Sequence, residues 1–113
     1  MDKIERLAEI IRDSKNICVF TGAGISCPSG IPDFRSSYGL YNREYGYNYS
    51  PEEIISHSFF VSKPELFYEF YKSAMLYPDA EPNDAHKFFA KLEAKGKNVS
   101  VVTQNIDSLH RTA

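Results

Sequence analysis

The feature that most constrains this chain is an apolar strand that runs directly into a glycine turn. Residues 17–20 are apolar throughout, and Gly22 and Gly24 follow them. Glycine has no Cβ, so the backbone can turn tightly there and approach a ligand closely. Backbone N–H groups in such a turn, ahead of a helix, are suited to bind a pyrophosphate. A Gly-x-Gly pair after a strand therefore indicates a dinucleotide site, although the pair alone is a weak signal.

The rest of this motif departs from the usual dinucleotide fingerprint. The third glycine would fall at position 27, which is Cys27, and residues 30–35 instead read Gly-Ile-Pro-Asp-Phe-Arg. The motif ends in Phe34 and Arg35, and an apolar ring can exclude water while a cation offsets pyrophosphate charge. The plain alternatives are a structural turn for the glycines, a surface ion pair for Arg35 and a turn role for Asp33.

Composition narrows the class of protein. The 113 residues are enough for one domain, and contents of 42% apolar and 25% charged residues are typical of a globular chain. A net charge of −2 argues against a general affinity for nucleic acid, and no apolar run approaches the ~20 residues of a membrane span. Cys18 and Cys27 give neither a disulfide framework nor the spacing of a zinc site. We therefore expect a reduced, cytoplasmic protein with Cys18 buried in its strand.

Hydrophobic spacing and capping signals predict helices around two strands. Asp2 should cap a first helix from Lys3 to about Ser14, with an apolar face that packs on the sheet. The strands are expected at residues 17–20 and 99–103. Further helices are expected at residues 51–56, 64–76 and 84–95, with Phe88, Phe89 and Leu92 facing inward, and from residue 106 onward.

The order of these elements predicts the fold class. A strand, several helices and a second strand describe a right-handed α/β crossover between parallel strands. In open α/β sheets, ligands bind beyond the carboxyl ends of the strands. The glycine turn and residues 104–107 each follow a strand directly, so we expect them to meet in one crevice.

Two separated motifs resemble one family. Residues 21–35, and residues 103–110 with the sequence Thr-Gln-Asn-Ile-Asp-Ser-Leu-His, are similar to motifs of the sirtuins, the NAD-dependent protein deacylases. The spacer is also similar, at Pro82-Asn83 and Ala85-His86. The resemblance implies a Rossmann-like parallel α/β sheet, incomplete at its C-terminus. Residues 1–113 would be the N-terminal part of the catalytic domain, with the zinc-binding small domain and the C-terminal half outside this chain.

The resemblance also implies roles for the first motif. Gly22, Ala23 and Gly24 would cradle the NAD pyrophosphate, Phe34 would lie beside the nicotinamide, and Arg35 would lie near the phosphates. Cys27 matches a cofactor-contacting position, although its thiol could simply pack. These residues lie in or next to residues 28–49, which show no sustained period and hold five tyrosines. The tyrosines could pack this loop on the domain; the resemblance implies a cofactor-binding loop, which we favour.

In the second motif, Gln104, Asn105, Ile106 and Asp107 resemble the pocket for the nicotinamide and its ribose. Asp107 can accept a hydrogen bond from the carboxamide NH₂, and it can also cap the last helix. The three histidines, His57, His86 and His110, are expected to be structural. The family's histidine base and its four zinc-binding cysteines would lie beyond Ala113, so no catalytic residue and no metal ligand is assigned in this chain.

The function that the resemblance implies is an NAD-dependent protein-lysine deacetylase. Such an enzyme cleaves NAD to nicotinamide and moves the acyl group of a lysine in a protein or peptide to ADP-ribose. Family members that prefer acidic acyl groups carry Tyr-x-x-Arg, whereas Tyr71 is followed here by Ala74, which predicts a neutral acyl group. Residues 1–113 alone are predicted to be inactive. The alternatives are a module that only binds NAD or ADP-ribose, and a fragment without a function of its own.

Overall fold

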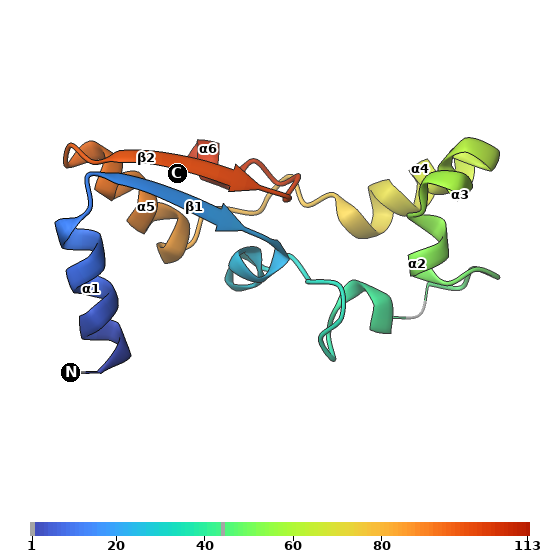
Figure 1. The fold of residues 1–113 in the computed structure, drawn as a ribbon. Helices are drawn as coiled ribbons and strands as arrows, with labels where there is room; N and C mark the ends of the chain where they lie inside the picture. Colours follow the sequence, from blue (N-terminus) through green and yellow to red (C-terminus); the bar gives the residue numbers. More distant parts are fainter. Residues whose placement is uncertain (1, 44) are drawn as a thin grey trace.

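A computed structural model describes residues 2–43 and 45–113 of the chain. The molecule is elongated, with extents of 52 × 26 × 25 Å, and has a two-stranded sheet toward one end and a group of helices at the other (Figure 1). Its elements are α1 (Lys3–Asp13), β1 (Asn16–Thr21), the 3-10 helix η1 (Ala23–Ser29), the 3-10 helix η2 (Leu40–Asn42), α2 (Pro51–Ile54), α3 (His57–Ser62), α4 (Pro64–Phe70), the π-helix η3 (Tyr71–Met75), α5 (Asp84–Ala94), β2 (Asn98–Thr103) and α6 (Leu109–Thr112).

The two strands pair in parallel, as predicted. The register runs from Asn16 opposite Asn98 to Thr21 opposite Thr103, and the helices lie on the crossover between the strands. The parallel sheet and the helical crossover together give the expected α/β architecture. Both strands end level with each other, so the segments that follow them leave the sheet at the same edge.

The prediction that Cys18 is buried is wrong. Of the β1 side chains only Val19 and Thr21 are buried, Cys18 is exposed, and Phe20 is 68% exposed. Strands of parallel sheets are normally covered on both faces. Here α5 packs against β2, whereas the other described elements leave most side chains of the two strands uncovered. A continuous apolar run therefore indicated a strand but not how deeply this strand is buried.

Helix α1 begins as predicted but does not pack on the sheet. Asp2 and Glu5 form a capping box, in which the Glu5 N–H donates to Asp2 Oδ1 over 2.7 Å. The helix leads away from the strands (Figure 1), and Ile4 and Leu7 are 80% and 55% exposed. Only its end is tied to the sheet, because Lys97 Nζ donates to backbone carbonyls at that end. The apolar side chains on one face of α1, among them Ile4 and Leu7, therefore do not pack against the described sheet.

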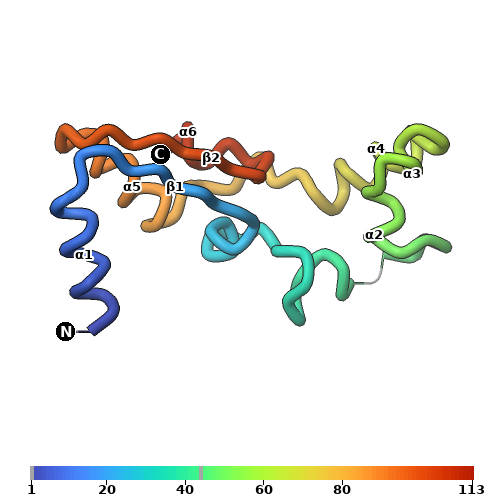
Figure 2. Tube along the Cα trace, viewed as in Figure 1, coloured from blue at the N-terminus to red at the C-terminus, as the bar shows by residue number. Residues whose placement is uncertain are grey.

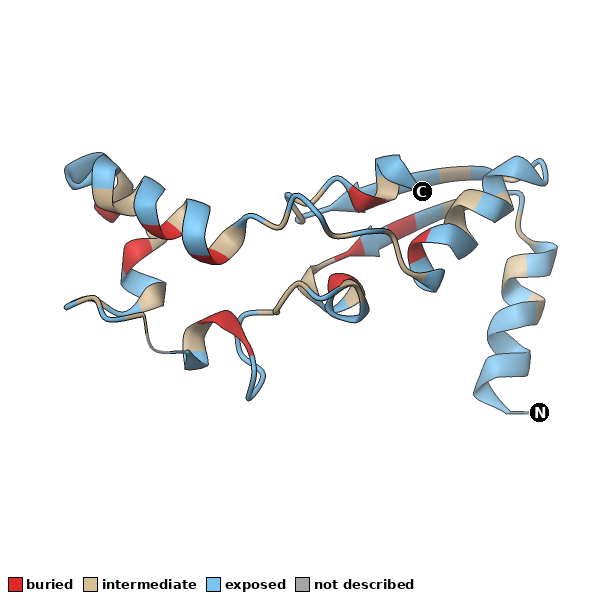
Figure 3. Cartoon of the chain, turned by 180° about the vertical axis from the view of Figure 1, so that it is seen from behind, coloured by how far each residue is buried: buried red, intermediate tan, exposed pale blue. Residues whose placement is uncertain are grey.

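The main hydrophobic core lies in residues 40–75, which we call the helical lobe. Its buried members are Leu40, Ile54, Phe59, Phe70 and Ala74. The loop tyrosines complete it: the ring of Tyr45 stands edge-on to Phe70 at 4.9 Å, and that of Tyr49 to Phe59 at 5.1 Å. The packing interpretation therefore holds for four of the five loop tyrosines, while Tyr38 is 83% exposed. Buried positions occur both in the lobe and at the strand ends (Figure 3), and two stretches of chain, after η1 and before α5, join the two regions (Figure 2).

Several helix boundaries differ from the prediction. The helix at residue 51 ends at Ile54, and Ser56 caps a separate helix, α3, that was not predicted. The helix from Pro64 continues through η3 to Met75, so its length was predicted correctly. The last helix begins at Leu109 rather than at residue 106, because Ser108 has a left-handed backbone with φ 62°.

Helix α5 keeps its predicted ends but not its predicted inner face. Asn83 caps it, and it ends at Ala94, ahead of Gly96 with φ 99°. The prediction that Phe88 faces inward is wrong, since Phe88 is 45% exposed; the buried side chain of this helix is His86. The described sheet is too narrow to cover the whole apolar side of α5.

Candidate functional site

The two motifs meet beyond the strand ends, as the topology predicted. The Gln104 N–H donates to the Thr21 carbonyl over 3.3 Å, which continues the strand pairing by one residue. The side-chain Nδ2 of Asn105 then donates to the Gly22 carbonyl over 2.8 Å. Further on, Ser26 Oγ donates to Asp107 Oδ2 over 2.5 Å. The glycine turn and residues 104–107 therefore form one hydrogen-bonded unit.

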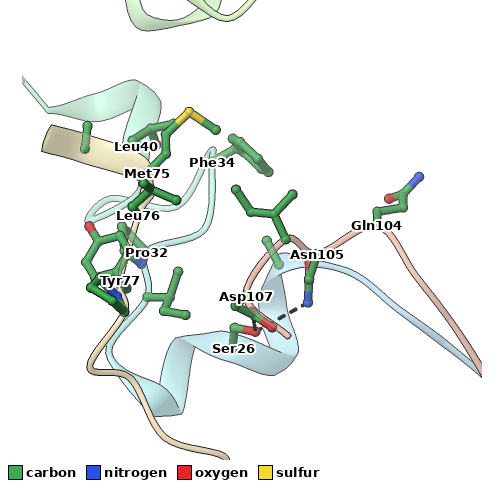
Figure 4. A pocket seen from close by; sticks show the side chains of 15 residues that line it. Ser26, Pro32, Phe34, Leu40, Met75, Leu76, Tyr77, Gln104, Asn105 and Asp107 are labelled. Atoms are coloured by element: carbon green, nitrogen blue, oxygen red, sulfur yellow. Dashed lines mark hydrogen bonds between the residues drawn. The ribbon is translucent and has the colours of Figure 1, made fainter. Parts of the chain in front are cut away.

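A cavity of about 490 Å³ opens beside this unit (Figure 4). Its size is that of a small-molecule site, and its lining is largely apolar with a few polar groups, as such sites usually are. The helical lobe and the connection after it form the opposite wall. The lining comprises Ala23, Ser26, Ile31, Pro32, Phe34, Leu40, Ala74, Met75, Leu76, Tyr77, Pro78, Gln104, Asn105, Ile106 and Asp107.

The cavity brings together six of the ten residues proposed from the sequence: Ala23, Phe34, Gln104, Asn105, Ile106 and Asp107. Within this set the side chain of Gln104 extends away from the other labelled residues (Figure 4). Four proposed residues do not line the cavity: Gly22, Gly24, Cys27 and Arg35. They lie on the adjoining turn and loop, which is where a ligand longer than the cavity would extend.

The described fold does not require glycine at position 22 or at position 24. Gly22 has an extended backbone, with φ −132° and ψ −164°, which any residue adopts, and Gly24 has no positive φ. A Cβ added at either position would meet no atom within 4 Å. Since neither conformation nor packing requires these glycines, their use fits a close approach by a ligand.

Gly39 shows the opposite case. A Cβ there would come within 2.6 Å of Asp33 Oδ1 and 2.8 Å of the Phe34 backbone. Asp33 accepts a hydrogen bond from the Ser36 N–H at 3.3 Å, which is the turn role that we weighed for it. The glycine and the turn together fold the loop back on itself and set the position of Phe34 at the cavity.

Phe34, Arg35 and Cys27 lie at the outer side of the site. The ring centres of Phe34 and Tyr41 are 5.4 Å apart. The Arg35 guanidinium carbon lies 5.2 Å from the centre of the Tyr41 ring. Within residues 2–43 and 45–113, no ion pair involves Arg35. Cys27 is exposed, and its thiol lies 3.7 Å from the Ala23 carbonyl. Arg35 is therefore an exposed cation stacked on Tyr41.

Asp107 caps the start of the last helix, which is one of the two roles weighed for it, and it also bonds to Ser26. Oδ2 accepts from Ser26, and Oδ1 accepts from the Leu109 N–H over 3.0 Å, which caps the start of α6. The side chain is half-buried in the cavity wall, and the strained backbone of Ser108 follows it. Such strain is found where a fold holds a functional residue in place.

Two histidines, His86 and His110, lie side by side outside the lining of the cavity. His110 Nε2 is 2.9 Å from Thr21 Oγ1, which also donates to Thr103 Oγ1 over 2.8 Å. The His86 ring stands edge-on to that of His110 at 4.9 Å. His86 is 1% exposed, its Nδ1 accepts from the Asn83 N–H over 3.1 Å, and its Nε2 has no partner among the described residues.

This surrounding changes the protonation of His86. Burial, and next the neighbouring His110, lower the pKa of His86, while the Asp107 carboxylate acts in the opposite direction. Because Nδ1 accepts a backbone N–H, the neutral ring carries its proton on Nε2. His86 is thus a neutral donor held close to the site.

Sequence reasoning missed the buried Ser26 and the wall formed by residues 75–78. Ser26 could have been found, because residues three apart share one side of a 3-10 helix and Ala23 was already proposed. The wall at residues 75–78 depends on how the lobe folds back, for which the sequence carries no local signal. Among the described residues, no three His, Cys, Asp or Glu side chains are grouped to hold a metal ion. No helix in residues 2–43 and 45–113 is long and apolar enough to cross a membrane.

Comparison with known proteins gives a consistent result. Residues 22–113 match the sequence model of the Sir2 family. The chain is 54% identical over 112 residues to an NAD-dependent protein deacetylase of Clostridium perfringens, covering 99% of this chain and 46% of that protein. It is 50% identical over 110 residues to a protein of the same description from Listeria innocua, covering 97% of this chain and 46% of that protein.

Solved structures agree with these sequence matches. A structure described as the basis for the mechanism and regulation of Sir2 enzymes superimposes with a TM-score of 0.82 at 47% identity, over 98% of this chain and 42% of the other. A Sir2 protein bound to a propionylated peptide superimposes with a TM-score of 0.75 at 40% identity, over 98% and 41%. The chain spans less than half the length of the curated relatives given above.

Proposed function

This chain belongs to the Sir2 family, and we propose that it forms the N-terminal part of an NAD-dependent protein-lysine deacetylase. The observation that carries the proposal is the hydrogen bond from Ser26 to Asp107, which joins the two motifs beside a 490 Å³ cavity. In this proposal residues 1–113 are part of an NAD-binding catalytic domain. The zinc-binding small domain, the histidine base and the C-terminal half belong to segments beyond Ala113.

The described residues fit NAD in their shape and chemistry. The cavity is large enough for a nicotinamide and its ribose, and its apolar lining suits an aromatic ring. The open space above Gly22 and Gly24 leaves room for a pyrophosphate against the backbone. The exposed Arg35, next in sequence to the cavity residue Phe34, offers a positive charge.

Each residue then has a definite task. Asp107 and Asn105 orient the carboxamide of the nicotinamide, with Asp107 as acceptor. Phe34 keeps water from the reacting sugar carbon, and Arg35 offsets the phosphate charge. Ile106, 57% exposed, and Gln104 line the same cavity and would contribute to the nicotinamide pocket. When bound, NAD supplies nicotinamide as a leaving group and a sugar carbon that receives the acyl oxygen.

We propose an acyl-lysine peptide or protein as the second substrate. Solved Sir2 structures include complexes with a propionylated peptide and with a deacetylated p53 peptide together with an acetyl ADP-ribose. In this chain the part of the cavity formed by Phe34, Leu40 and Ala74 is apolar and suits an uncharged acyl group.

The test is equilibrium binding of NAD and of ADP-ribose, which lacks the nicotinamide, to wild type and to Asp107→Asn. The variant should bind NAD about tenfold more weakly and ADP-ribose almost normally. Asparagine keeps an acceptor oxygen for the Leu109 N–H and its NH₂ can donate to Ser26 Oγ, whereas the carboxamide loses a charged acceptor. Ser37→Ala, an exposed change on the loop, is the control. Equal losses for both ligands, or no binding of NAD by wild type, would refute the assigned site.

A second candidate is a module that binds NAD or ADP-ribose without catalysis. The placement of the histidines favours it for residues 1–113 taken alone, because His86 is buried and His110 is bonded to Thr21. His57 begins α3 in the helical lobe and does not line the cavity. The binding test above does not separate the two candidates, whereas the turnover measurement in the Discussion does.

A further inference from the structure

The side chain of Asn83 bonds to two parts of the structure at once. Its Nδ2 donates to the Ile25 carbonyl over 2.7 Å and to Ser29 Oγ over 2.9 Å, and both acceptors lie in η1. Its Oδ1 accepts from the Ala85 N–H over 2.9 Å, in the first turn of α5. One amide group therefore ties the 3-10 helix of the glycine turn to the N-terminus of α5.

Helix η1 depends on few such ties. A 3-10 helix has poorer internal hydrogen bonds than an α-helix, and of the η1 side chains only Ser26 is buried. Among the described residues, side chains from outside η1 bond to it at two places. Asn105 and Asp107 reach Ser26 from one side, and Asn83 reaches Ile25 and Ser29 from the other.

Capping alone does not account for the choice of asparagine at position 83. Serine and aspartate cap helices as well as asparagine does, because each offers an acceptor oxygen to the first turn. Of these three, asparagine alone also carries an NH₂ group, which donates two hydrogen bonds. Both of those donors are used here, and both point at η1 rather than at α5.

We propose that Asn83 is a positioning residue for the cofactor site. It does not line the cavity; it holds η1 against residues 104–107, so that the glycine turn, Ser26 and Asp107 keep the arrangement in which NAD binds. This inference rests on the proposed function for the identity of the ligand. The fixing of η1 itself does not depend on that identity.

The test compares Asn83→Ser with Asn83→Ala. Serine keeps the cap of α5, adds no charge and is too short to reach η1, whereas alanine loses the cap and the tie together. Hydrogen exchange of backbone amides is measured separately for η1 and α5 in the ligand-free chain. We expect the serine variant to exchange at least about fivefold faster in η1 and as slowly as wild type in α5, and to bind NAD about tenfold more weakly.

Ser29→Ala is the matched control, since it removes one of the two acceptors of Asn83 and leaves the cap intact. It should accelerate exchange in η1 less than Asn83→Ser does, and it should add nothing in the Asn83→Ser background. If Asn83→Ala fails to fold, the serine variant still decides the question.

Wild-type exchange of η1 in Asn83→Ser, or wild-type affinity for NAD in that variant, would overturn the inference. A wild-type chain that binds no NAD would overturn the proposed function and with it the cofactor part of this inference. In that case the exchange of η1 still shows whether Asn83 holds the helix.

Discussion

Ser26 and Asp107, 81 residues apart in the chain, are joined by a 2.5 Å hydrogen bond between Oγ and Oδ2. Ser26 is 1% exposed and lies in the 3-10 helix after the first strand, and Asp107 lies in the segment after the second. Together with the bonds from the Asn105 side chain to Gly22 and Ser26, this bond ties the two segments that follow the strands.

The first prediction concerns stability. Ser26→Ala should lower the free energy of unfolding by about 1–3 kcal/mol, because it removes a buried donor from a charged acceptor. Urea unfolding followed by circular dichroism measures the change. Ser37→Ala, on the exposed surface of the loop, should stay within about 0.5 kcal/mol of wild type. A Ser26→Ala chain as stable as the Ser37→Ala control would show that the bond adds nothing to folding.

The second prediction concerns turnover. Residues 1–113 alone should release no nicotinamide from NAD in the presence of an acetyl-lysine peptide. The reason is that no described histidine lines the cavity: His86 is buried, and His110 Nε2 is bonded to Thr21 Oγ1. Chromatography of the reaction products measures the released nicotinamide directly, with a full-length relative as the positive control. NAD-dependent release by the purified 113-residue chain would mean that a base within it had been overlooked.

The third prediction concerns the acyl group. Ala74 is 6% exposed and lines the apolar part of the cavity, so an acyl carboxylate there would be buried without a cationic partner. A full-length protein containing this chain should prefer acetyl-lysine to succinyl-lysine in peptides of one sequence. Ala74→Arg should shift the preference toward succinyl-lysine, because arginine pairs with a carboxylate. A wild-type preference for the succinyl peptide would contradict the argument.

The fourth prediction concerns pH. His86 has a lowered pKa in the folded chain and its ordinary value, near 6.5, in the unfolded chain. The unfolded state therefore binds more protons between these two values, so the stabilisation is complete above pH 6.5 and is lost as the pH falls through the lowered pKa. Unfolding free energies at pH 7.5, 6.5 and 5.5 should decrease, by at most about 1.4 kcal/mol per pH unit for this one group.

The control for this effect is His86→Gln, which keeps an acceptor for the Asn83 N–H at the third helical position. The pH dependence should be shallower in this variant than in wild type, while the exchange protection of α5 stays the same. Identical pH dependence in both chains would assign the effect to other groups.

Local signals predicted much of this fold. The caps at Asp2 and Asn83 and the β-branched run at residues 99–103 act through neighbouring residues, and each element formed where expected. Parallel pairing followed from the order of elements, and the meeting of the two motifs followed from the pairing. Six of the ten proposed site residues line the cavity for this reason.

The remaining errors involve contacts between distant parts of the chain. Whether Cys18, Phe88 and the apolar stripe of α1 are covered depends on what packs against them, which no local pattern specifies. The late start of α6 results from the left-handed backbone at Ser108, and serine rarely takes that conformation. The cavity wall at residues 75–78 is set by the packing of the helical lobe.

The most direct test of the central claim, that the two motifs form one NAD site, is a nuclear magnetic resonance titration of the ¹⁵N-labelled chain with NAD. We expect saturable shifts in the amides of residues 22–27 and of residues 104–107 with a single dissociation constant. ADP-ribose should shift the first group strongly and the second weakly, because it lacks the nicotinamide. Shifts that miss either group, or that give different dissociation constants for the two groups, would contradict the account.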